Sequence, residues 1–145
     1  VYCWGLNANQ QTGVPSDAAL CVGQPCVRRP SRVGRHEQMI DVAAGARHTC
    51  ALNTQGDVWC WGNNSAGQLG MGVIGGMRYG QTHDQLLAVR VGRLEPVVGL
   101  TAGVDSNCTR TAEGRIFCWG ANTTGQLGTG ACTTAEALPV EVHLQ

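Results

Sequence analysis

The sequence predicts an all-β protein made of tandem copies of one unit, because a short motif recurs at a fixed spacing. Cys-Trp-Gly occurs three times along the 145 residues, at Cys3-Trp4-Gly5, Cys60-Trp61-Gly62 and Cys118-Trp119-Gly120. Residues 31–72 also align with residues 89–130 at a constant offset of 58, without a gap. A period of this size indicates one supersecondary unit copied along the chain. Such copies bury their apolar faces against their neighbours, which predicts an array.

Each copy is expected to contain short strands and no long helix. In the best preserved copy the predicted strands are residues 39–44, 48–52, 57–61 and 88–91, which end at Gly or at polar residues. No long window keeps an apolar period of about 3.6 residues. The 21 glycines recur at matching places, as turns between strands require. Three or four strands per copy predict a blade of antiparallel sheet, and radially stacked blades form a β-propeller.

The repeat frame divides the chain into a partial repeat, residues 1–30, and two further repeats, residues 31–88 and 89–145. About two and a half units predict a partial or open propeller. The chain is then either a piece of a longer ring or an open array that neighbouring subunits complete. Residues 1–20 lack a basic start and an apolar core, so no signal peptide is expected there. Apolar stretches are short, so no direct membrane insertion is expected.

Two cysteine pairs are duplicated with the repeat. Cys50 and Cys60 are ten residues apart, as are Cys108 and Cys118. If each hairpin loop has three residues, both pairs lie directly across their ladders. Opposed Cβ atoms lie ~4.5–5.5 Å apart, so a modest adjustment would form disulfides Cys50–Cys60 and Cys108–Cys118. Free thiols are one alternative. A zinc site is another, although no Cys-x-x-Cys pair is present and no His accompanies the second hairpin.

The other four cysteines lie outside these pairs. Cys21 and Cys26 could close a small loop as a third disulfide, whereas Cys3 lacks the partner that the repeat predicts and Cys132 has no repeat equivalent. The partners of Cys3 and Cys132 are left open. Eight cysteines in a chain of this length, two pairs of them duplicated, indicate an oxidising compartment. The expected location is extracellular, at the cell surface or periplasmic.

The motif order resembles that of a known repeat family. Cys-Trp-Gly is followed by Asn and Gly-Gln-Leu-Gly, and is preceded by His-Thr-Cys-Ala-Leu at residues 48–52. This order is similar to the regulator-of-chromosome-condensation repeat family, and the paired cysteines are similar to its secreted bacterial members. The match is complete in residues 31–72, good in 89–130 and degraded in 3–15. The resemblance implies seven-bladed propellers of four-stranded blades and a role in protein–protein recognition.

Charge is balanced. Ten arginines, with no lysine, face ten acidic residues, and the net charge is zero. This composition provides no basic field for nucleic acid or for an anionic membrane, so neither partner is expected. The abundance of Arg, Ala and Gly without Lys is typical of a GC-rich bacterial genome.

Several motifs favour structural roles. Residues 70–75 match Gly-x-Gly-x-x-Gly but lack the strand–turn–helix context of a dinucleotide site. One Trp per copy predicts core packing between blades, with stacking on a sugar or base as the alternative. None of the histidines recurs in the repeat, so blade-edge structural roles are expected for His36, His48, His83 and His143.

Function is expected in the segments where the copies differ. Residues 73–87 contain Arg78, Tyr79 and His83, and residues 13–29 form a second such segment. Arg and Tyr are enriched at binding hot spots, and a His makes a contact sensitive to pH near neutrality. Variable loops on a fixed scaffold commonly carry binding residues.

The leading hypothesis is a non-catalytic extracellular β-propeller module that binds another macromolecule through these loops. Its partner is expected to be a protein or neighbouring subunits, with no cofactor and no metal. The alternative is a structural subunit of an extracellular fibre, coat or larger assembly. An enzyme is not expected, because no acid–base pair or metal cluster recurs.

Overall fold

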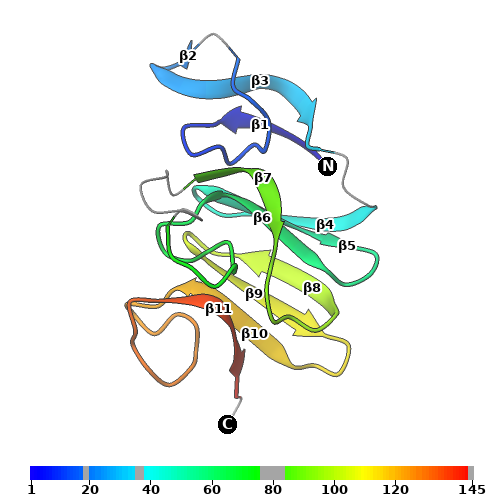
Figure 1. Ribbon diagram of the computed structural model, residues 1–145, viewed down its shortest axis with the longest axis vertical. Coiled ribbons are helices and arrows are strands. Elements are labelled where there is room, and N and C mark those ends of the chain that lie inside the picture. The colour runs from blue at the N-terminus through cyan, green and yellow to red at the C-terminus, as the bar shows by residue number, and fades with distance from the viewer. Residues whose placement is uncertain (18–19, 35–37, 76–83, 144–145) are drawn as a thin grey trace.

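Three antiparallel sheets are stacked along the long axis of the molecule, as the all-β prediction required (Figure 1). The computed structural model describes residues 1–17, 20–34, 38–75 and 84–143. We call the sheets blades 1, 2 and 3 in chain order. Blade 1 contains β1 (Tyr2–Leu6), β2 (Leu20–Cys21) and β3 (Gln24–Arg32). Blade 2 contains β4 (Met39–Ala44), β5 (His48–Asn53), β6 (Val58–Asn63) and β7 (Asp84–Arg90). Blade 3 contains β8 (Val97–Ala102), β9 (Ser106–Thr111), β10 (Ile116–Ala121) and β11 (Ala135–Val142).

Blades 2 and 3 are four-stranded meanders, in which each strand pairs with the next along the chain. Blade 1 differs, with the order β1-β3-β2. The register shows that β1 is equivalent to β6 and β10: Tyr2 pairs with Arg32, Trp59 with Arg90 and Phe117 with Glu141. Blade 1 therefore contains the third and fourth strands of the unit, extended by β2. Within the described residues, the other edge of β1 has no strand beside it.

Most of the predicted strands are confirmed to within about two residues, and two segments differ. Strand β7 begins at Asp84, four residues before the predicted start. Residues 13–29, expected to be a variable loop, contain β2 and most of β3. Among the described residues this hairpin has no counterpart in the other two repeats, and its sequence does not recur there, so the repeat frame carried no signal for it. The repeat boundaries fall within β3 and β7, so a sequence repeat begins in the last strand of one blade.

The predicted disulfides are confirmed. Cys50 is paired directly with Cys60, and Cys108 with Cys118, with Cα atoms 4.1 Å apart in each pair. A third disulfide joins Cys21 and Cys26 across the β2–β3 hairpin. The free-thiol and zinc alternatives therefore do not apply to the four ladder cysteines. Cys3 and Cys132 are free thiols, and burial raises the pKa of Cys3.

Tryptophans at the blade interfaces form the centres of the core, as predicted for Trp61 and Trp119, which are 1% and 0% exposed. Trp61 Nε1 donates to the carbonyl oxygen of Gln11 in blade 1, and Trp119 Nε1 donates to that of Gln68 in blade 2, each at 3.0 Å. The prediction of a core role was wrong for Trp4, which is 61% exposed. No blade among the described residues covers this ring. The described part of the chain contains no helix that could span a membrane.

Candidate binding face

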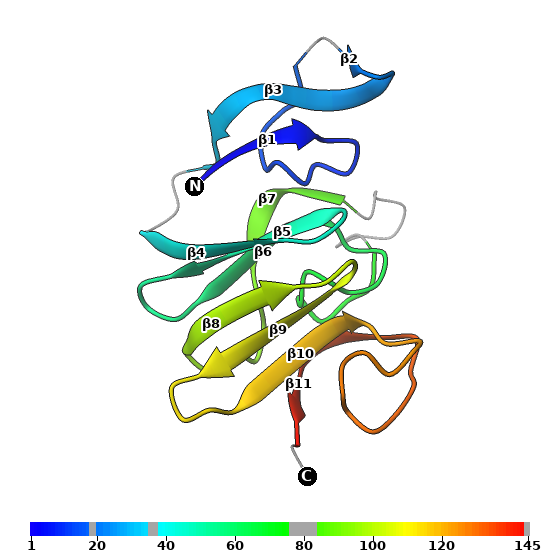
Figure 2. The ribbon, with the colours of Figure 1, turned by 180° about the vertical axis from the view of Figure 1, so that it is seen from behind.

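The loops that differ between repeats gather on one side of the array. Their described parts, at residues 7–17, 64–75 and 122–134, follow strands β1, β6 and β10 and lie to the left in Figure 1 and to the right in Figure 2. The short turns at residues 45–47 and 103–105 lie on the same side, because antiparallel strands return the chain to the same edge. We call this side the loop face.

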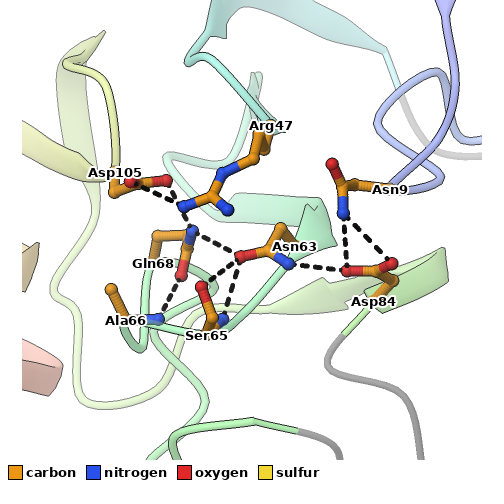
Figure 3. Close-up of polar contacts among 8 residues, drawn as sticks. All are labelled: Asn9, Arg47, Asn63, Ser65, Ala66, Gln68, Asp84 and Asp105. Carbon is orange, nitrogen blue, oxygen red and sulfur yellow. Dashed lines mark hydrogen bonds and ion pairs between the residues drawn. The ribbon is translucent and has the colours of Figure 1, made fainter.

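A hydrogen-bond network lies beneath the loop face and begins at the base of the longest loop (Figure 3). Asn63, the last residue of β6, is in register with Asp84, the first residue of β7. The Asn63 Nδ2 atom donates to Asp84 Oδ1 at 2.7 Å. Asn9 Nδ2 of blade 1 lies 3.4 Å from each oxygen of the same carboxylate. The end of β6 and the start of β7 are thus joined to each other and to blade 1.

The network continues from Asn63 through Gln68. The Asn63 Oδ1 atom accepts from the Ser65 amide at 3.0 Å, the Ser65 hydroxyl at 2.6 Å and Gln68 Nε2 at 3.1 Å. Gln68 Oε1 accepts from the Ala66 amide at 2.8 Å. The side-chain amide oxygens of Asn63 and Gln68 are therefore satisfied by donors within the turn that they hold. Gln68 is fully buried and Asn63 is 5% exposed, so the turn cannot shift without breaking hydrogen bonds out of contact with water.

Blade 3 closes the network on the other side. Gln68 Nε2 also donates to Asp105 Oδ1 at 3.0 Å, and Asp105 Oδ2 lies 2.9 Å from Arg47 Nη2. The Arg47 side chain is 46% exposed and that of Asp105 is 18% exposed. The buried Gln68 amide thus holds Asp105 in place, and Asp105 holds Arg47. The two side chains bring a negative and a positive charge to the surface, where both are partly exposed. Such an arrangement suits hydrogen bonding and ion pairing to a partner.

Beside the network, His48 is buried between blades 2 and 3. Its Nε2 lies 2.9 Å from Asn107 Oδ1, while Asn107 Nδ2 donates to the Gln68 carbonyl at 2.8 Å. Because Nδ2 must donate there, Oδ1 accepts, and the His48 proton is on Nε2. Among the described residues, the His48 Nδ1 atom has no hydrogen-bond partner. Burial lowers the pKa of His48 and outweighs the opposing effects of Asn107 and Asp105. The structural role expected for this histidine fits its environment.

The predicted binding residues Arg78, Tyr79 and His83 lie outside the described residues. The described ends of their segment, Val73–Gly75 and Asp84, lie at the loop face. In the second predicted segment, the Arg28 guanidinium lies 3.2 Å from the Asp17 carboxylate on the exposed side of blade 1.

Sequence reasoning missed Arg47, Asp84 and Asp105. A signal was present for the pair, since positions 47 and 105 are equivalent in the repeat and carry opposite charges. Across the described residues, no group of three His, Cys, Asp or Glu side chains is placed to hold a metal ion.

Two models of one repeat family match the chain. Both describe the regulator of chromosome condensation (RCC1) repeat; one matches residues 39–68, and the other residues 1–52 and 113–144. The chain belongs to the RCC1 repeat family. The secreted and bacterial character inferred from the paired cysteines stays a prediction.

Curated relatives of this RCC1-repeat chain include much larger proteins. The probable E3 ubiquitin-protein ligase HERC4 of Rattus norvegicus is 36% identical over 72% of the chain, which covers 10% of that protein. The probable E3 ubiquitin-protein ligase HERC3 of Homo sapiens is 34% identical over 88% of the chain, covering 11% of that protein. The chain therefore spans about a tenth of the length of these relatives.

Solved structures of two proteins share the fold. Prp20p of Saccharomyces cerevisiae, reported with its binding properties to Gsp1p and histones, superimposes with a TM-score of 0.79 and 19% identity, covering 97% of this chain and 33% of that one. Human WBSCR16 gives a TM-score of 0.71 with 22% identity, covering 94% and 33%. The three sheets are accordingly blades of a partial β-propeller.

Proposed function

We propose that this RCC1-repeat array is a non-catalytic binding module and that its loop face binds another protein. The observation that carries the proposal is the hydrogen-bond network from Asn9 through Gln68 to Asp105, which joins the loop bases of all three blades. A binding surface needs loops held by a rigid frame, because ordering a mobile loop on association opposes binding. Buried and fully paired amides provide that frame here.

The loops above the frame supply the specificity. Residues 73–87 differ completely in composition from the equivalent segment after Gly128, although the preceding Gly-Gln-Leu-Gly turns are identical. Arg47 and Asp105 add charges of both signs at the base of these loops. A protein surface carrying an acidic and a basic group in complementary positions fits this arrangement. The solved structures of Prp20p, one of them with Kap60 bound, support protein recognition as a use of this fold.

An oxidising location is part of the proposal. Three disulfides, two of them on the central strands of the blades, are typical of extracellular or periplasmic proteins. The absence of a nucleic-acid partner, inferred from the zero net charge, stays a prediction.

The test is a comparison of two sides of the same molecule. One variant deletes seven residues from the segment 73–87, so that Gly70 and Ala88 are 11 positions apart, as Gly128 and Pro139 are, and a milder one carries Arg78→Ala and Tyr79→Ala. A matched control carries Gln55→Ala and Glu113→Ala in the turns opposite the loop face.

For the measurement, a protein captured by the wild-type chain is purified, and its affinity for each variant is measured by biolayer interferometry. We expect the loop variants to bind about 30-fold more weakly, as for hot-spot residues. An unchanged affinity of the shortened variant, with loss in the control, would place binding on another side.

A further inference from the structure

A β-hairpin at residues 20–26 extends blade 1 at its loop-face end, and among the described residues it has no counterpart in blades 2 and 3. Register makes Cys26 equivalent to Asp84 and Ala135, the first residues of β7 and β11. Residues 20–25 therefore lie beyond the end of the blade, on the side of the loops and not between blades. Figure 1 shows β3 beginning at the left, where the loop face lies.

Pro15 explains why the chain takes this course. The equivalent residue in blade 2 is Gly72, which has a φ of 86° and donates its amide to the Ala137 carbonyl of blade 3 at 2.9 Å. Proline has no N–H and holds φ near about −65°, so Pro15 can form neither that turn nor that hydrogen bond. The loop of blade 1 therefore departs from the course of the blade 2 loop after Gly13, and it leads into the hairpin.

The base of the hairpin is fixed to blade 1. A disulfide joins Cys21 to Cys26, and Cys26 is fully buried. The Asn7 amide donates to the Pro25 carbonyl at 2.8 Å, and the Asp17 amide donates to the Cys26 carbonyl at 2.9 Å. The hairpin is thus held in one position relative to the loop face before any partner arrives. A contact made by such an element loses little conformational freedom on association.

The tip of the hairpin is strained. Cys21 is paired with Gln24, so Val22 and Gly23 form a two-residue turn, with φ angles of 50° and 76°. Positive φ at both positions defines the type I′ turn, which strongly favours Asn-Gly. A β-branched residue rarely adopts this conformation, because its side chain crowds the backbone. Of the three non-glycine residues with a positive φ in the described part of the chain, Val22 alone is β-branched.

The same tip is exposed and apolar. Val22 is fully exposed, at 102%, and Leu20 is 61% exposed. A Cβ atom built on Gly23 would meet no other heavy atom within 4 Å. Val22 therefore opposes folding through both its backbone and its exposed side chain, and no packing within the described chain offsets either effect. Strained residues of this kind concentrate at sites that contact ligands.

The composition of the hairpin distinguishes a protein partner from a lipid surface. Residues 20–26 contain no basic and no aromatic residue. Elements that lie in a membrane interface use basic residues to reach anionic lipid and commonly use aromatic rings as well. A small aliphatic tip on a fixed hairpin instead has the form of a side chain that fills a desolvated pocket, the setting in which hot-spot residues are found.

We propose that Val22, together with Leu20, docks in an apolar pocket of the protein that binds the loop face. This inference rests on the proposed function and adds one contact, together with the chemistry of the partner surface that receives it. The tip lies on the same side as the loops, so one partner can contact both. Docking would bury the apolar surface that the free chain leaves in water.

The test measures stability and binding together, because the proposal gives them opposite signs. Val22→Asn suits the type I′ turn and removes the apolar side chain. We expect its melting temperature to rise by about 2–4 °C and its binding to weaken about tenfold. Val22→Ile keeps the strain and the apolar side chain, so both quantities should stay near those of the wild type. The same change to Asn at Val98, which is 53% exposed at the end of β8 away from the loop face, is the matched control. It should neither raise the melting temperature nor weaken binding.

The probe for binding is the protein purified on the wild-type chain in the loop-face experiment, and biolayer interferometry gives its affinity for each variant. If Val22→Asn binds as the wild type does while the shortened loop variant binds weakly, this inference is wrong and the proposed function stands. If only the tip variant binds weakly, the hairpin contact stands and the loops are not the binding site. A wild-type chain that retains no protein from an extract of its source organism overturns both.

Two further outcomes would overturn the inference alone. A melting temperature of Val22→Asn that does not rise would show that the tip is not strained. Flotation with phosphatidylglycerol vesicles tests the lipid alternative. Wild-type chain that floats with the vesicles, and Val22→Asn chain that does not, would assign the tip to a membrane surface and not to a protein pocket.

Discussion

The two blade interfaces share one hydrogen bond but differ in the amount of core around it. In both, an indole N–H meets a Gln carbonyl at 3.0 Å. Around Trp61, between blades 1 and 2, the buried cluster of described residues contains only Val33 and Ala51 besides the ring, and its other members are partly exposed. Between blades 2 and 3 the cluster around Trp119 has seven further buried members: Cys50, Leu52, Val58, Cys60, Leu69, Val91 and Val97. The same motif is therefore embedded in a small core on one side of blade 2 and in a large core on the other.

The difference arises from the first strand of a blade. Strand β8 of blade 3 lies against β4 and β5 of blade 2, and Leu100 of β8 packs on the large cluster. Val42 of β4 is the repeat equivalent of Leu100, but it is 49% exposed, since blade 1 has no first strand among the described residues. Equivalent residues are thus buried or exposed according to the neighbour they meet. A stack of blades is stabilised mainly by its interfaces, as in other repeat proteins.

The largest expected effect is the loss of a docked ring. Trp119→Ala should lower the free energy of unfolding by about 3–5 kcal/mol, and Trp61→Ala should lie at the lower end of that range, because fewer neighbours surround the cavity. Trp4→Ala is the matched control and should change stability by about 0.5 kcal/mol or less, because this ring is 61% exposed. Urea unfolding followed by far-ultraviolet circular dichroism measures all three.

This ordering can be broken in two ways. Equal losses for Trp61→Ala and Trp119→Ala would mean that the indole hydrogen bond, not the surrounding apolar cluster, decides the strength of an interface. An unchanged melting temperature for Trp61→Ala, together with lost partner binding, would make the rings a binding surface.

The contrast between interfaces also explains which features the sequence predicted. Pairing of Cys50 with Cys60 follows from hairpin spacing alone, and burial of Trp61 and Trp119 follows from their recurrence. Exposure of Trp4 was not predictable from its motif, because burial depends on the blade that lies in front of it. The candidate site was harder still. Its hydrogen bonds join residues from three blades, and each choice of partner depends on the packing of blades against each other.

The second effect concerns the donor that accompanies each indole. Asn107→Ala should lower the free energy of unfolding by about 1–3 kcal/mol, since it removes the bond to the Gln68 carbonyl and leaves His48 Nε2 buried without an acceptor. Thr49→Val is the matched change at the other interface. It removes only the hydroxyl that donates to the Gln11 carbonyl, and should cost about 1 kcal/mol. Equal losses in urea unfolding would show that His48 contributes nothing to the difference.

The smallest effect is a pH dependence confined to the interface between blades 2 and 3. Burial holds the pKa of His48 below its ordinary value, so at mildly acidic pH the unfolded chain binds a proton that the folded chain does not. Stability is therefore complete above the unfolded pKa of about 6.5 and declines as pH falls toward the lower folded pKa. The proton would be placed on Nδ1, which has no acceptor in the described part of the chain, with Arg47 opposing the added charge and Asp105 favouring it. His48→Gln keeps a donor for Asn107 and does not titrate, so its unfolding free energy should fall less than that of the wild type between about pH 7 and pH 5.

The carboxylates with lowered pKa values, Asp17, Glu113 and Glu141, do not account for such a difference. They lose their contributions to stability at lower pH, and they do so in the wild type and in the variant alike. Parallel curves for the two chains over this window would show that the interface accepts a charged His48.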